Sequence, residues 1–237
     1  MPKGKSDVVS VPGLLILSSK MSKTMSNSPE VLGGIKTSTS SSDVLRFGPE
    51  ENTKTLGLLW SSKNDNFGFY ICTSQKTNRV TKRIILSDTA RIFDPLGLIS
   101  PCVVTAKVIL QDLWNLKLSW DDPIPGDLLA RWSKFQSEFA ALNQVSIHRH
   151  IVCCNPVRME LHGFADASQR AYGCCIYIRS MDTNGQSQVH LLCSKTRVAP
   201  LKSISIPRLE LCAAQMLGRL YEQVVSSLTM KIEEYFM

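Results

Sequence analysis

The chain has 237 residues, of which 43% are hydrophobic, and a formal net charge of +7 at pH 7. This length accommodates one or two domains with a buried core, and no apolar run approaches the roughly 20 residues that a membrane-spanning helix needs. We therefore expect no membrane partner. Eight cysteines, with no C-x-x-C pair and no recognisable secretory segment, indicate an intracellular protein with reduced thiols.

The positive charge is concentrated in residues 61–110, which contain seven Lys and Arg against three Asp and Glu. Neutralising phosphates releases counterions, so such a cluster gives affinity for nucleic acids without reading their sequence. The cluster predicts a nucleic-acid-binding patch, and a solvated basic surface is the alternative. The residues expected to contact nucleic acid there are Lys76, Arg79, Lys82, Arg83 and Arg91.

The first half of the chain changes from a polar tail to regular structure. Residues 1–51 are rich in Ser, Thr and Lys without a sustained apolar period, which predicts disorder. Two aromatic-rich strands joined by a polar turn are expected at Thr53–Trp60 and Phe67–Ile71. A helix from Thr81 must end before Pro95, because the residue preceding a proline is pushed out of the helical region.

Two amphipathic helices are expected next, and a short connection between them predicts a helical hairpin. The first follows Pro101, with apolar residues at Ala106, Ile109, Leu113, Leu116 and Trp120. The second covers about residues 127–142, with one face formed by Leu128, Trp132, Phe135, Phe139 and Leu142. At this spacing Trp114, Trp120 and Trp132 favour core packing, and base stacking is the functional alternative.

From Val145 the apolar period changes to two, which is typical of strands. Three strands are expected, at residues 158–166, 172–179 and 188–194. Asn184-Gly185 suits the tight turn between the last two. Pro207 indicates the start of a helix that lasts to about residue 225, and the residues after it are expected to extend this helix or fray.

Two carboxylates occupy key positions in this region: Asp166 at the end of a strand and Glu210 in the opening turn of the last helix. A strand-borne Asp and a helix-borne Glu with a hairpin between them can converge on one divalent metal. Mg²⁺ usually needs more ligands or substrate phosphates, so the pair predicts a weak Mg²⁺ site. The alternative is two solvated carboxylates, the second one favoured by the helix dipole. His148, His150, Cys153 and Cys154 fit no common zinc spacing.

Several distinctive blocks occur between residues 52 and 225. They include T-L-G-L-L-W (55–60), T-K-R-I-I-L-S (81–87), F-D-P-L-G-L-I-S-P (93–101), L-H-G-F-A-D-A-S (161–168), S-K-T-R-V-A-P-L-K (194–202) and I-P-R-L-E-L (206–211). Together they resemble the pol polyprotein of Pao/BEL-type long-terminal-repeat retrotransposons, between the reverse transcriptase palm and ribonuclease H. This region is often labelled the Pao retrotransposon peptidase of the A17 aspartic peptidase group.

The resemblance implies an α+β fold, in which a helical connection region precedes an incomplete ribonuclease H-like antiparallel hairpin sheet with a packed helix. The implied parts are a tail at 1–51, a reverse transcriptase palm-end and thumb-connection-like region at 52–145, and a truncated ribonuclease H-like domain at 146–237. The resemblance also implies an RNA–DNA hybrid or other nucleic acid as partner, and further pol or gag segments.

In the family the resemblance points to, Asp166 and Glu210 match the first two of four acidic residues that hold two Mg²⁺ ions. Ser168 and Arg208, close to them in sequence, are expected to contact nucleic acid. The remaining acidic residues and the reverse transcriptase motif Tyr-x-Asp-Asp have no counterpart in the sequence. We therefore expect a pol fragment without complete catalytic activity.

Two other functions remain open. One is a nucleic-acid-binding module that uses the basic cluster and the hairpin sheet. The other is the A17 peptidase, whose chemistry in retroviral-type enzymes needs Asp-Thr/Ser-Gly, because two such aspartates share a proton. The nearest match, Asp88-Thr89-Ala90, has alanine where glycine is needed and stands in a helical context. This departure from the required motif is evidence against proteolytic activity.

Overall fold

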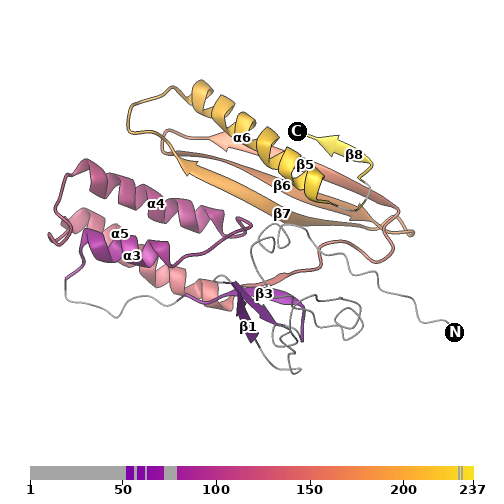
Figure 1. Ribbon diagram of the computed structural model, residues 1–237, viewed down its shortest axis with the longest axis horizontal. Coiled ribbons are helices and arrows are strands. Elements are labelled where there is room, and N and C mark those ends of the chain that lie inside the picture. Colours follow the sequence, from indigo (N-terminus) through magenta and orange to yellow (C-terminus); the bar gives the residue numbers. More distant parts are fainter. Residues whose placement is uncertain (1–51, 56–57, 62, 72–78, 229, 231) are drawn as a thin grey trace, which may run out of the picture.

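The structure, a computed structural model, describes residues 52–55, 58–61, 63–71, 79–228, 230 and 232–237. The tail predicted at residues 1–51 and the basic residue Lys76 lie outside this part of the chain. Figure 1 shows a small sheet, a group of helices, and a larger sheet that carries one long helix on its face. None of the helices in the described part is long and apolar enough to cross a membrane.

The small sheet is antiparallel, in the order β1-β2-β3-β4. Its strands are β1 (Asn52–Thr55), β2 (Leu58–Ser61), β3 (Asn66–Phe69) and β4 (Ser146–His148). The prediction of one strand at 53–60 was wrong, since β1 and β2 pair with each other and place Thr55 opposite Leu58. Because β4 joins this sheet, the three residues after the expected boundary at 145/146 belong to the first sheet.

The helical region confirms the predicted helices. It comprises α3 (Lys82–Ala90), α4 (Ser100–Asn115), α5 (Gly126–Phe139) and a 3₁₀ helix, η1 (Ala140–Gln144). Pro101 lies in the first turn of α4. The buried core between these helices includes Ile85, Ile109, Leu113, Leu128 and Trp132. Leu116 and Trp120 were wrongly assigned to this core face: α4 ends before them, and they are 47% and 42% exposed.

The larger sheet has the order β7-β6-β5-β8. Its strands are β5 (Arg158–Ala167), β6 (Ala171–Met181), β7 (Ser187–Val198) and β8 (Glu234–Phe236). The first three are antiparallel, as expected, and Gly185 adopts a positive φ of 79° in the turn before β7. Helix α6 (Ile206–Ser227) then covers one face of the sheet (Figure 1). Ser205 is its N-cap residue but makes no side-chain capping bond.

The end of the chain differs from its prediction. Instead of extending α6, residues 234–236 form β8, which pairs in parallel with the outer edge of β5. Aromatic packing accounts for this position, because the ring of Tyr235 contacts Tyr221 of α6 at 5.7 Å between centroids, and Phe236 stacks on His162 at 4.7 Å. The sheet is therefore mixed rather than purely antiparallel.

The two faces of β5 have different surroundings. Leu161 is fully buried and Gly163 lies beneath α6, where a Cβ added to the glycine would be 3.0 Å from Leu217 Cδ1. The absence of a side chain therefore allows the helix to approach the strand closely. Side chains alternate between the faces of a strand, so Glu160 and His162 belong to the opposite face. There Glu160 is 3% exposed and its carboxylate is surrounded by basic side chains, those of Arg158, His162 and Arg179.

The loop F-D-P-L-G, which connects α3 and α4, contacts the larger sheet. The carboxylate of Asp94 accepts hydrogen bonds from the backbone N–H groups of Leu98 (2.8 Å) and Ile99 (2.9 Å) at the start of α4. Burial raises the pKa of this carboxyl above its usual value, although these backbone bonds oppose the shift. On the other side of the loop, Ser194 of β7 donates its N–H to Leu96 O (2.9 Å) and its hydroxyl to Gly97 O (2.5 Å). Two of the sequence blocks therefore meet in space.

Candidate functional site

Asp166 and Glu210 lie at the same end of the larger sheet. Asp166 is the penultimate residue of β5, and Glu210 stands near the N-terminus of α6. Both side chains are exposed. Figure 1 shows that α6 begins above the end of the sheet at which β5 and β7 finish, and that it then runs back over the strands.

The contact between Leu217 and Gly163 fixes the relative level of the two carboxylates. Glu210 precedes Leu217 by seven residues, which is nearly two helical turns and about 10.5 Å along α6, on the same side of the helix. Asp166 follows Gly163 by three residues, which is about 10 Å along β5. Since α6 runs back over β5, both displacements point to the same end of the sheet. The carboxylates therefore reach the same level.

The two carboxylates approach this end from different sides. Asp166 is three residues from Gly163, so alternation along β5 assigns it to the face opposite α6. One of its oxygens, Oδ1, accepts a hydrogen bond from the N–H of Ala167 at 2.7 Å. The other, Oδ2, has no hydrogen-bond partner among the residues that the structure describes. A cation shared with Glu210 would therefore lie beyond the end of β5 rather than beneath the helix.

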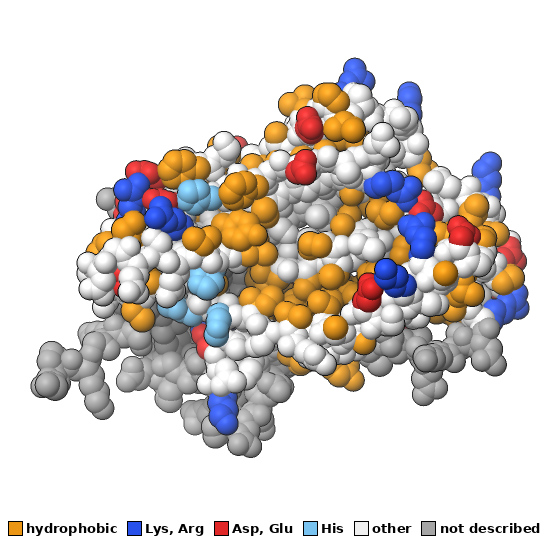
Figure 2. Space-filling model, turned by 180° about the vertical axis from the view of Figure 1, so that it is seen from behind, with side chains coloured by type: hydrophobic (Ala, Val, Ile, Leu, Met, Phe, Trp, Pro, Cys, Tyr) orange, Lys and Arg blue, Asp and Glu red, His pale blue; other side chains and the backbone are white. Residues whose placement is uncertain are grey.

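Five basic side chains surround this end of the sheet, and we call them the basic rim. All five are exposed: Arg170, Lys195, Arg197, Lys202 and Arg208. The register of β6 and β7 places Arg197 opposite Tyr172, next to the turn that follows β5. Lys and Arg side chains are exposed in several places on the face of the molecule seen from behind (Figure 2). This end of the sheet therefore combines two carboxylates with a surplus of positive charge.

Sequence reasoning identified only Arg208 of the basic rim. The signal was present in the block S-K-T-R-V-A-P-L-K, which carries three of its members. It was missed because charge was counted over long segments, and residues 161–237 as a whole have only a small basic excess. Folding concentrates this excess at one end, since the hairpin between β6 and β7 returns Arg197 to the level of Arg170.

Ser168 has a structural task in the turn between β5 and β6. Its hydroxyl oxygen accepts from the N–H groups of Arg170 (3.3 Å) and Ala171 (3.2 Å), and the hydroxyl donates to Ala171 O (3.0 Å). This turn also contacts α4, because Arg170 Nη2 donates a hydrogen bond to Asp112 Oδ1 at 2.5 Å. Burial acts to raise the pKa of Asp112, but the hydrogen bonds from Arg170 and Arg131 hold it below its usual value. This ion pair fixes the position of the basic rim relative to the helices.

The basic cluster predicted at residues 61–110 is not a uniform surface. Arg79 and Arg91 are exposed. Lys82, by contrast, is only 5% exposed, and its ammonium lies 3.5 Å from the centre of the Trp114 ring. The guanidinium of Arg83 forms a two-pronged ion pair with Asp121, with both N–O distances at 2.9 Å. Lys82 and Arg83 are thus held by contacts within the protein, so the cluster does not form one uniform phosphate-binding surface.

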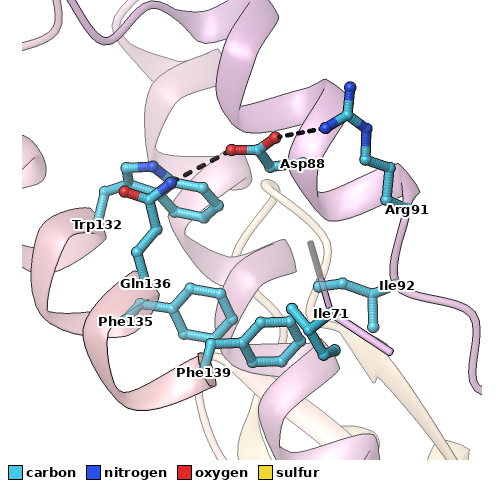
Figure 3. Close-up of a pocket in the computed structure, with 8 residues that line it drawn as sticks. All are labelled: Ile71, Asp88, Arg91, Ile92, Trp132, Phe135, Gln136 and Phe139. Atoms are coloured by element: carbon cyan, nitrogen blue, oxygen red, sulfur yellow. Dashed lines mark hydrogen bonds and ion pairs between the residues drawn. The ribbon is translucent and has the colours of Figure 1, made fainter. Parts of the chain in front are cut away.

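The Asp-Thr-Ala sequence considered for a peptidase lies within helix α3. Asp88 is 9% exposed and accepts a hydrogen bond from Gln136 Nε2 at 3.2 Å, while Thr89 donates to Ile85 O at 2.7 Å. Figure 3 shows Asp88 between Gln136 and Arg91, with the ring of Trp132 beside it and the ring of Phe135 below. The helical backbone and these hydrogen bonds hold both side chains against the helical core. An aspartic peptidase instead needs two aspartates that share a proton.

Three antiparallel strands, a helix across them and a parallel strand beside the first define the leading part of a ribonuclease H-like fold. Asp166 near the end of β5 and Glu210 near the start of α6 are the two carboxylates that the sequence resemblance predicts for this class. Residues 81–237 match the family described as the Pao retrotransposon-like RNaseH-like domain, and the chain belongs to that family. The match extends over the helical region as well as the larger sheet. No curated protein matches the chain.

Proposed function

We propose that this retrotransposon pol-derived, ribonuclease H-like region binds an RNA–DNA hybrid at the end of the larger sheet. The proposal rests on two exposed carboxylates, Asp166 near the end of β5 and Glu210 near the start of α6, at the end of the sheet that carries the basic rim. Exposed Lys and Arg attract the phosphate backbone. Carboxylates would repel it unless a cation lies between them and the phosphates, so the combination suits a metal-assisted nucleic-acid site better than a purely electrostatic one.

A Mg²⁺ ion fits this site only together with substrate. Mg²⁺ is commonly bound through one or two carboxylates, several waters and the phosphates of a substrate. Asp166 and Glu210 would supply the protein ligands, and the hybrid would supply phosphate oxygens. When bound, such an ion activates water and stabilises the leaving oxygen of a phosphodiester. The described residues contain no group of three or more potential metal ligands, and we therefore expect no hybrid cleavage by the 237-residue chain alone.

Binding measured with and without Mg²⁺ tests the proposal. We expect the affinity for a blunt RNA–DNA hybrid to fall steeply with salt, because the basic rim releases counterions. At fixed ionic strength Mg²⁺ should strengthen binding, and Asp166→Asn or Glu210→Gln should abolish this gain. Glu222→Gln is the matched control, since Glu222 is an exposed carboxylate on the same helix, far along from its N-terminus.

Two outcomes contradict the proposal in different ways. Hybrid affinity that is absent or insensitive to salt would remove the nucleic-acid site altogether. Salt-dependent binding with the same Mg²⁺ response in the wild type and in Asp166→Asn would instead support the second candidate, a binding module without a metal. That candidate rests on the basic rim alone. Mg²⁺-dependent cleavage that Asp166→Asn abolishes would show that the site supports catalysis, contrary to our expectation.

A further inference from the structure

Two tryptophans form an exposed aromatic surface next to the helical core. Trp114 lies at the C-terminal end of α4 and Trp120 in the loop that follows, and they are 44% and 42% exposed. Their rings meet edge to face, with centroids 5.4 Å apart. Trp132, which the sequence grouped with them, is 1% exposed and belongs to the core. Adjacent exposed rings form a contiguous apolar surface, which is a candidate interaction site.

A buried cation holds this pair in place. The ammonium of Lys82 lies 3.5 Å from the centre of the Trp114 ring and 5.3 Å from that of Trp120, and it donates to Leu118 O at 3.4 Å. Arg83 lies 5.7 Å from the Trp120 ring. Cations this close to aromatic faces attract them. The two rings are therefore fixed before any partner arrives, while a large part of each stays open to solvent.

The charges around the rings suit a polyanion. Arg79, Arg83 and Lys117 are exposed nearby. Arg83 and Asp121 neutralise each other through their two-pronged pair, and Asp122 accepts the N–H of Ser119 at 2.8 Å. Proteins stack the bases of single-stranded nucleic acids on aromatic rings that lie among basic side chains.

The tryptophans also lie toward the end of the molecule that carries Asp166. Asp112, two residues before Trp114, pairs with Arg170 of the turn that follows β5. Gln111 Nε2 donates to Ala199 O at the end of β7. Figure 1 shows that the C-terminal end of α4 and the ends of β5 and β7 point to the same side of the molecule. The end of α4 that carries Trp114 and the basic rim therefore lie at the same end of the molecule.

We propose that Trp114 and Trp120 form a stacking platform for unpaired bases, and that it engages the single strand that continues from a hybrid bound at the basic rim. The inference rests on the proposed function for its hybrid partner, but the platform is a separate site. It predicts that the protein prefers a hybrid with a single-stranded extension to a blunt one. It also predicts that a free single-stranded oligonucleotide binds to the platform directly.

The test compares a blunt RNA–DNA hybrid with the same hybrid carrying a short oligothymidylate extension. The extension should strengthen binding by roughly tenfold, given that stacking contributes about 1–3 kcal/mol per base. Trp120→Ala and Trp114→Ala should each remove most of this gain and leave blunt-hybrid affinity unchanged. Trp114→Phe should retain part of it. Leu116→Ala is the matched control, because Leu116 is exposed to a similar degree, follows α4 directly and has no ring.

Each result decides between the platform and its alternatives. Equal wild-type affinity for the two hybrids overturns the platform, as does a preference for the extension that survives in both Trp→Ala variants; a protein partner for these rings would give the first result. If blunt hybrids do not bind at all, the proposed function fails. The platform then still stands if free oligothymidylate quenches the tryptophan fluorescence of the wild type and Trp114→Phe/Trp120→Ala abolishes that quenching.

Discussion

Replacing Gly97 with alanine tests the junction between the helical region and the larger sheet. Gly97 has a φ of +72°, a conformation that L side chains rarely adopt. A Cβ at this position would lie 2.6 Å from the backbone carbon of Ser194 and closer still to its carbonyl oxygen. Both atoms belong to the backbone of β7, which is held by its pairing with β6. The loop must therefore move away from the strand.

The expected loss is the sum of two effects. The left-handed backbone conformation costs a non-glycine residue about 1–2 kcal/mol. Moving the loop also breaks the two hydrogen bonds that Ser194 donates to Leu96 O and Gly97 O, each worth about 1 kcal/mol. We therefore expect Gly97→Ala to lower the free energy of unfolding by about 3–4 kcal/mol, a large share of the 5–15 kcal/mol that is usual for a domain.

Gly185→Ala is the matched control. Gly185 has a similar φ of +79°, but a Cβ there would meet nothing within 4 Å. It should therefore lose only the conformational part, about 1–2 kcal/mol. Urea unfolding followed by circular dichroism measures both losses. If Gly97→Ala costs no more than Gly185→Ala, the contact with Ser194 does not hold the two parts together and our account of the F-D-P-L-G block is wrong.

Two further predictions concern buried carboxylates. The hydrogen bonds from His162 and then Arg179, together with the charges of Arg179 and Arg158, lower the pKa of Glu160, although burial opposes the shift. Its stabilising effect is therefore complete above the ordinary carboxyl pKa of 4.5 and is lost as the pH falls through the lower folded value. The difference in melting temperature between wild type and Glu160→Gln should accordingly be constant near neutral pH and narrow below about pH 4.5; a difference that grows in acid would contradict this. Asp88→Asn should leave any self-processing of a longer polyprotein unchanged, when its fragments are followed by electrophoresis, and should lower stability. Loss of processing without loss of stability would revive the peptidase function.

Much of the fold could be predicted from local sequence patterns. The three- and four-residue steps of Leu128, Trp132 and Phe135 require a helix with one buried face, and α5 has that face. The period of two from residue 158 onward required strands, and Gly185 indicated the turn between the last two. Helix starts at Pro101 and Pro207 follow from the fixed φ of proline. These features depend on residues only a few positions apart, so local sequence patterns are sufficient to predict them.

The pairing of strands that are distant in sequence could not be predicted from local patterns. Glu234 pairs with Glu160, and no local signal in E-Y-F distinguishes a parallel strand from the frayed end of a helix. The division of the first strand into β1 and β2 likewise depends on which residues find each other as partners. A short run of residues gains its hydrogen bonds only when a complementary edge is present, so its conformation is decided by the rest of the fold.

The sequence by itself determined the family resemblance and the two carboxylates that define the candidate site, because these depend on residue identity and spacing. Only the tertiary structure decided their surroundings. It gathered Arg170 and Arg197 into the basic rim, placed Lys82 beneath the rings of Trp114 and Trp120, and sent Trp132 into the core. Exposure and charge density are properties of a surface, and a surface exists only once strands and helices distant in sequence have packed together.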